Sequence, residues 1–176
     1  MDGNAFDLGV ELHTRKVQYI LSYDLWSRFG SVGLNLSFEN WTSVKYLDAT
    51  SSGLNAEVDT IPNDVGGLYL FYVPCRVVPG ITEFPFYIGR AQKTDSQNIR
   101  KRVKEYFQHF ARDNERPKIY RMLKVWGPQL RLAYYPLPTN QTIVNLEKDI
   151  INSLLLPMND QIPDKEIKAA ITAFEL

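Results

Sequence analysis

The apolar pattern is clearest in the middle of the chain, where it predicts two strands. Residues 65–73, VGGLYLFYV, are β-branched and aromatic and run into Pro74, as expected for the end of a strand. Residues 84–89, FPFYIG, predict a second strand. The connection between them is short and carries a Pro79-Gly80 turn signal, so we expect an antiparallel hairpin.

Helical periodicity follows the hairpin. Apolar residues that recur three or four positions apart predict helices over 99–110, 119–126 and 143–154. A third strand is predicted over 130–137. Gly127-Pro128 and Pro157 follow the second and third helices and mark their ends. The order β-β-α-α-β-α predicts an α+β fold, with a small three-stranded antiparallel sheet flanked by helices.

The N-terminal third has a different texture. Helical spacing over 10–29 predicts one or two helices, whereas 36–60 is rich in Ser, Asn, Asp and Thr and predicts loops with at most a short strand. We therefore divide the chain into an N-terminal extension, 1–60, and a main domain, 61–176. The extension is a candidate recognition, dimerisation or partner-binding segment.

Charge changes this picture because it is unevenly spread. The 176 residues carry 20 Lys or Arg and 20 Asp or Glu, a formal net charge of zero. Residues 90–131 alone hold 12 basic and 4 acidic residues, a balance of +8, while 1–89 and 132–176 are both acidic. Local potential decides whether a polyanion is attracted, so nucleic acid stays a candidate partner. The alternative is a solvated helix face.

Several functional classes lose support. A single cysteine, Cys75, allows neither an internal disulfide nor a cysteine metal cluster. There is no P-loop, dinucleotide-binding, zincin or hydrolase-elbow motif, so we expect no nucleotide cofactor. The sequence shows neither a signal peptide nor an apolar run of about 20 residues, so we expect a cytoplasmic or nucleoid-associated protein with no membrane partner.

A few residues fit a pure packing account poorly. Glu147 falls beside the apolar stripe of its helix, where a carboxylate needs a partner or a metal unless it sits at an exposed edge. Arg102 borders the stripe of an earlier helix and suits a phosphate, unless its stem merely covers the core. Gly89 weakens its strand unless a backbone must approach something closely. His109 lies in the basic helix and is a candidate phosphate contact or an exposed residue.

Taken together, these motifs resemble the GIY-YIG nuclease family. Gly67-Leu68-Tyr69 is a variant of GIY in which Leu replaces Ile, and Tyr87-Ile88-Gly89 matches YIG. Residues 87–107 are similar to the corresponding segment of the excision-repair incision nucleases. The remaining matches are Arg102 in N-[LI]-x-x-R, Tyr106 four residues later, Glu147 in the last helix, and Asn159 in P-x-N. The resemblance covers about residues 64–160 and leaves the N-terminal extension outside.

The resemblance implies DNA phosphodiester hydrolysis with one divalent metal. Glu147 would hold Mg²⁺ or Mn²⁺. Tyr69 would orient or deprotonate the attacking water. Deprotonation would need positive charge from Arg90 and Arg102 to lower the pKa of the Tyr69 phenol. Tyr87 and Tyr106 would contact the phosphate or the water, and Arg90 and Arg102 would also neutralise charge on the phosphate. Asn159 would brace the core. The residues expected to contact nucleic acid are Gly89, Lys93, Arg100, Lys101, Lys104 and His109.

Three functions are therefore weighed. The leading hypothesis is a stand-alone DNA endonuclease of the restriction, phage or repair type, with a homodimer as one way to cut both strands. The second is a catalytically silent nucleic-acid-binding module that keeps the fold. The third is a protein-interaction factor that uses aromatic residues such as Trp26, Phe29 and Trp41.

Overall fold

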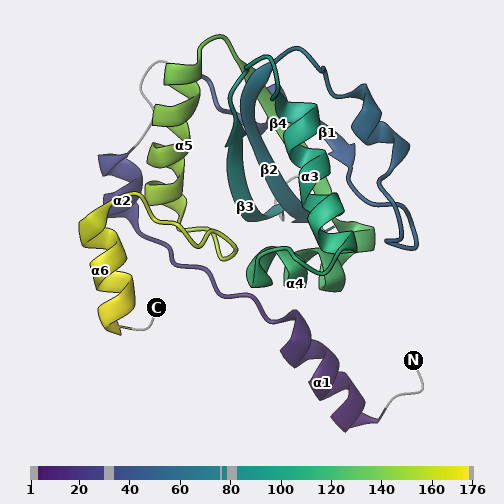
Figure 1. Ribbon diagram of the computed structural model, residues 1–176. Helices are drawn as coiled ribbons and strands as arrows, with labels where there is room; N and C mark the ends of the chain where they lie inside the picture. Colours follow the sequence, from purple (N-terminus) through teal and green to yellow (C-terminus); the bar gives the residue numbers. More distant parts are fainter. Residues whose placement is uncertain (1–3, 30–33, 76, 79–82, 175–176) are drawn as a thin grey trace.

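The structure, a computed structural model, describes residues 4–29, 34–75, 77–78 and 83–174 (Figure 1). Within these ranges the strands form one antiparallel sheet in the order β1-β4-β2-β3, and no helix is long and apolar enough to cross a membrane. The strands are β1 (Thr42–Lys45), β2 (Gly66–Pro74), β3 (Glu83–Ala91) and β4 (Arg131–Leu137). The α-helices are α1 (Ala5–Arg15), α2 (Tyr23–Arg28), α3 (Ile99–Ala111), α4 (Pro117–Trp126), α5 (Asn140–Leu154) and α6 (Lys165–Phe174).

The α+β class is confirmed, but the sheet has four strands where the sequence predicts three. The additional strand, β1, comes from the N-terminal extension and pairs antiparallel with β4. Tyr46, just after β1, is fully buried, and its hydroxyl donates to the carbonyl oxygen of Val103 in α3 at 2.6 Å. The main domain thus shares its sheet and core with residues 42–46. The predicted Pro79-Gly80 turn lies outside the described residues.

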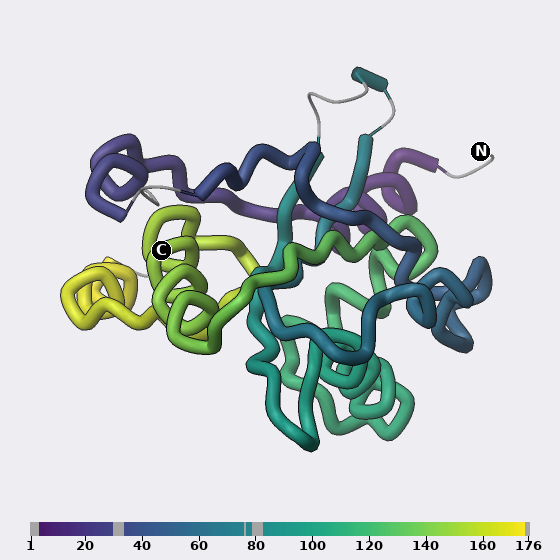
Figure 2. Tube along the Cα trace, turned by 90° about the horizontal axis from the view of Figure 1, so that it is seen from above, coloured from purple at the N-terminus to yellow at the C-terminus, as the bar shows by residue number. Residues whose placement is uncertain are grey.

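Alternation along β2 divides the core between the two faces of the sheet. Leu68 packs with α5, whereas Tyr69 and Phe71 pack with α3 and α4. Figures 1 and 2 show α5 on one side of the sheet and the α3–α4 pair on the other. Because successive side chains in a strand point to opposite faces, two neighbouring residues can serve two separate cores.

A β-bulge changes this alternation in β3. Phe71 pairs with Tyr87 and Tyr72 with Pro85, so Phe86 is an extra residue in β3. Phe86 and Tyr87 therefore both pack in the core on the α3–α4 side. Tyr87 keeps the face of its partner Phe71, and the bulge adds Phe86 to that face, where its ring packs edge-on against Trp126 of α4.

β3 lies at the edge of the sheet, and one side chain replaces the missing neighbour strand. Asn159 is buried, donates from Nδ2 to the Ile88 carbonyl oxygen at 2.8 Å, and accepts from the Ile88 N–H at 3.0 Å. The Met158 N–H also donates to the Phe86 carbonyl oxygen. The segment after α5 reaches this edge because Leu155 takes a left-handed conformation (φ 45°) that ends the helix.

Replacing Asn159 by Ala should lower the free energy of unfolding by about 2–4 kcal/mol, because the buried N–H and C=O of Ile88 both lose their partner. Asn145→Ala is the matched control, since Asn145 is exposed on α5, and it should change stability by less than about 0.5 kcal/mol. Urea denaturation measures both. Equal stability of the two variants would contradict the bracing role of Asn159.

Candidate active site

A pocket of about 790 Å³ opens beside the free edge of β3. Five of the six residues expected to act in catalysis line it: Tyr69 from β2, Tyr87 and Arg90 from β3, Arg102 from α3 and Glu147 from α5. An edge strand has no neighbour on one side, so side chains from both faces of the sheet can meet around it. Tyr87 belongs to the core on the α3–α4 side, and Arg90 contacts Glu147 of α5 on the other.

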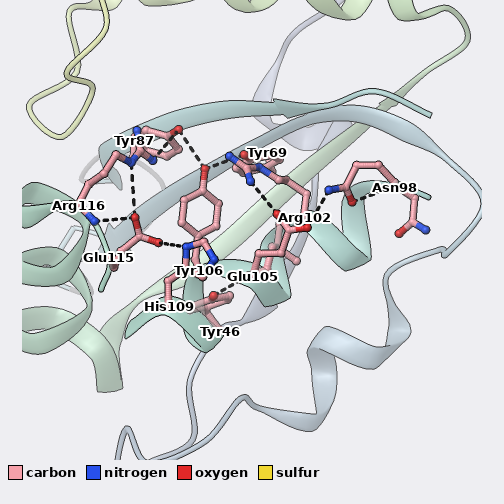
Figure 3. Close-up of polar contacts among 12 residues, drawn as sticks. Tyr46, Tyr69, Tyr87, Asn98, Arg102, Glu105, Tyr106, His109, Glu115 and Arg116 are labelled. Carbon is pink, nitrogen blue, oxygen red and sulfur yellow. Dashed lines mark hydrogen bonds and ion pairs between the residues drawn. The ribbon is translucent and has the colours of Figure 1, made fainter. Parts of the chain in front are cut away.

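The sixth residue, Tyr106, connects the tyrosines beneath the pocket. Its hydroxyl lies 2.8 Å from the Tyr69 hydroxyl and 3.0 Å from the Tyr87 hydroxyl, and all three side chains are buried (Figure 3). The two contacts join β2 and β3 to α3. Hydroxyls can donate and accept, so the three form a continuous hydrogen-bonded chain at the base of the pocket.

Gly89 makes this arrangement possible. It pairs directly with Tyr69 across the two strands. A Cβ at Gly89 would lie 2.5 Å from the Tyr69 hydroxyl oxygen and 2.7 Å from the ring carbon that bears it. Gly89 is buried under this ring, so the structure accounts for the glycine by packing of Tyr69 and not by contact with a DNA backbone.

Burial keeps Tyr69 and Tyr106 protonated. From the sequence, Arg90 and Arg102 are expected to lower the pKa of Tyr69. Burial instead raises the pKa of Tyr69 far above its ordinary value, and the neighbouring Tyr87 adds to this, while the Arg102 charge offsets only part. The pKa of Tyr106 is raised for the same reason. At neutral pH Tyr69 is therefore a neutral phenol, suited to orienting a water.

Glu147 is the carboxylate of the pocket. Its side chain is 15% exposed and forms an ion pair with Arg90 through Oε2. Burial raises the pKa of the Glu147 carboxyl above its ordinary value, and the Arg90 charge counteracts only part of this effect. Arg90 is the ion-pair partner of Glu147, and Arg102 is the arginine whose charge lowers the pKa of Tyr69.

The donor set suits a hard divalent cation. Within the described residues there is no cluster of three or more His, Cys, Asp or Glu that could hold a metal. Mg²⁺ needs no such cluster, because it keeps several waters and is commonly held by one or two carboxylates together with substrate phosphates. Glu147 is one mostly buried carboxylate that faces a pocket large enough for water and phosphate, so it is the residue that could hold Mg²⁺ or Mn²⁺.

Two arginines flank the tyrosines, and the sequence motifs point to only one of them. Arg102 lies over the Tyr106 ring at 5.2 Å and pairs with Glu105 at 2.6 Å. Arg116, which the sequence analysis missed, lies over the Tyr87 ring at 5.4 Å and donates to the Tyr87 hydroxyl at 3.3 Å (Figure 3). Both line the pocket. In the sequence, Arg116 is marked only by its place among the basic residues of 90–131, directly before Pro117, with which α4 begins.

The other basic candidates do not gather at the pocket. Arg100 donates to the carbonyl oxygen of Ile61, and Lys104 pairs with Asp59, so both face the segment before β2. Lys101 donates to the carbonyl oxygen of Ser96. His109 approaches Glu115 at 3.7 Å, and the Lys93 backbone is bound by the Asn140 side chain. None of the five lines the pocket. The basic block of the sequence is thus dispersed over several surfaces.

Comparisons of the chain with protein-family models, with curated proteins and with solved structures found no match.

The raised pKa of Glu147 predicts a pH-dependent stability difference. A carboxyl whose pKa is higher in the folded state contributes stability below its unfolded value, and loses it as the pH rises through the folded value. Glu147→Gln should therefore gain stability relative to the wild type between pH 4 and pH 7.5. Urea denaturation at the two pH values tests this, with the exposed Glu39→Gln as control. A Glu147→Gln difference that stays constant with pH would contradict the buried charge.

Proposed function

We propose that the chain is a metal-dependent DNA endonuclease that hydrolyses phosphodiester bonds with a GIY-YIG site. One observation carries the proposal: side chains from β2, β3, α3 and α5, selected by their match to that family's motifs, converge on one pocket. Tyr106, selected in the same way, joins the two tyrosines of this pocket by hydrogen bonds. Packing alone gives no reason for such a set to share a pocket.

The proposed chemistry assigns a role to each group. A divalent cation held by Glu147 would supply Lewis-acid stabilisation of the phosphate and of the leaving oxygen. Arg102 and Arg116 place two positive charges beside the tyrosines, where charge developing on a phosphate would be stabilised. Arg90 neutralises Glu147 until a cation competes for the same carboxylate.

Tyr69 would hold the attacking water as a neutral phenol. Its hydroxyl is fixed by Tyr106 and lines the pocket, so it can accept or donate a hydrogen bond at a set position. Because burial opposes ionisation, we assign Tyr69 to orientation and not to proton removal. Tyr87, fixed by Tyr106 and Arg116, would contact the phosphate or the same water.

We extend the proposal to the core of the fold and to the biological role. From β2 to α5 the order is β-β-α-α-β-α, the order expected of the GIY-YIG core within 61–176. Residues 1–60 would then supply β1 and a recognition or dimerisation segment. We propose a restriction, phage or repair role in the cytoplasm or nucleoid. DNA would be the partner, and a homodimer would cut both strands.

A silent nucleic-acid-binding module is the second candidate, and one observation favours it. The Arg90 guanidinium already occupies Glu147, the carboxylate that a cation would need. Metal-dependent cleavage decides between the two, because a silent module would bind DNA in a salt-sensitive way and leave it intact.

Purified wild-type protein should nick supercoiled plasmid with Mg²⁺ and not with EDTA. Glu147→Gln and Arg102→Ala should fold normally and lose cleavage by about 10²-fold or more, because each removes a charged group that acts on the transition state. The controls Glu39→Gln and Arg112→Ala change exposed residues of the same types outside the pocket. Cleavage at the control level by either Glu147→Gln or Arg102→Ala would overturn the proposal.

Tyr69→Phe tests the hydroxyl separately from the ring. It should lower the cleavage rate by about 10²-fold, because the phenol no longer orients the attacking water. Tyr72→Phe is the matched control on the same strand: it also removes a hydroxyl contact of a buried tyrosine, with Ser43 at 2.7 Å, but lies outside the pocket. Urea denaturation should show similar losses of stability in Tyr69→Phe and Tyr72→Phe. Plasmid nicking should show a large loss of cleavage rate in Tyr69→Phe alone. Equal rates would argue against a role for the hydroxyl.

A further inference from the structure

A second hollow lies next to the catalytic pocket, on the other side of the segment that follows α5. Its volume is about 520 Å³, and it lies between this segment, α4 and the chain just after α1. Asn159, Asp160 and Ile162 line both hollows, so the two share a wall. In Figure 1 the purple chain leaving α1 passes the loop between α5 and α6, with α4 beside it.

Positive charge is concentrated along these two hollows. Among the described residues, eight Lys or Arg side chains and two carboxylates, Glu147 and Asp160, line them. The eight cations are Lys16, Arg90, Arg102, Arg116, Lys118, Arg121, Lys148 and Lys168. The whole chain has a formal net charge of zero, so this excess is a local feature of one surface.

The chain holds this second hollow in shape by specific contacts. Arg121 of α4 donates to the carbonyl oxygens of Thr14 and Lys16 at 2.9 and 3.1 Å, which fixes the segment after α1 against α4. Lys118 pairs with Asp160 at 3.2 Å, and both side chains are partly exposed. An exposed pair of this kind is weak, so a phosphate can replace Asp160 as the partner of Lys118.

We infer that the second hollow binds the nucleic-acid backbone next to the scissile phosphate, so that the strand runs from the Arg102 side of the pocket past Lys168 and Lys118 toward Lys16. This inference rests on the proposed function and adds the direction of the bound strand. Contacts of lysine with backbone phosphates position the substrate without reading its sequence. Lys101 and Lys104 of α3 line neither hollow and are not part of this track.

Two of the helices offer matched lysines that separate this track from general charge. Lys118 and Lys124 both lie on α4, and Lys168 and Lys165 both lie on α6, and all four are exposed. Only Lys118 and Lys168 line the hollows. Lys118→Gln with Lys168→Gln therefore removes the same charge from the same two helices as Lys124→Gln with Lys165→Gln.

The test measures binding of a labelled 30-base-pair duplex by fluorescence anisotropy over a range of salt, in full-length protein carrying Glu147→Gln to prevent cleavage. The track variant, which carries Lys118→Gln and Lys168→Gln, should bind about 10-fold more weakly near 0.1 M salt. The slope of log affinity against log salt should become shallower by about 2, because two phosphate contacts are lost. The control variant should match the Glu147→Gln parent.

Equal weakening in the two double variants, or parental binding by the track variant, would overturn the inferred track. If wild-type protein still nicks plasmid in that case, the proposed nuclease function stands and only the track fails. A chain that neither binds the duplex nor nicks plasmid overturns both.

Discussion

The free edge of β3 is held by the two hydrogen bonds of Asn159 to Ile88, and the candidate site depends on this contact. A neighbouring strand there would satisfy the same backbone groups but would close the space into which Tyr87 and Arg90 reach. The Asn159 amide satisfies them with one side chain. It also fixes the segment that separates the candidate active-site pocket from the second hollow. One brace therefore keeps the edge open and shapes both cavities.

The tyrosine chain is the second constraint. Tyr69 can lie across β3 only because Gly89 has no side chain, and Tyr106 then fixes the hydroxyls of Tyr69 and Tyr87. Burial also raises the pKa of Tyr69 and of Tyr106 and so opposes their ionisation. A site of this kind favours orientation of water by neutral hydroxyls and stabilisation of charge by arginines, with proton removal left to groups other than Tyr69.

Periodicity located the elements with strong apolar faces. β2, β3, β4 and α3 to α5 lie within a few residues of the predicted ranges, because each buries a regular set of side chains. β1 has only four residues, and α6 buries Ile167 alone, so neither leaves a clear pattern. Sequence spacing cannot reveal contacts that depend on tertiary packing. Examples are the ion pair of Arg90 with Glu147 and the contacts of Arg100 and Lys104 with residues 59–61.

The proposed cation site is a single carboxylate, and diffraction tests that position most directly. Crystals grown with Mn²⁺ and measured at the manganese absorption edge should show an anomalous peak against the Glu147 carboxylate. Glu147→Gln crystals should lack it. Mn²⁺-dependent cleavage in solution together with a peak elsewhere in the wild-type crystal, and none at Glu147, would contradict the account.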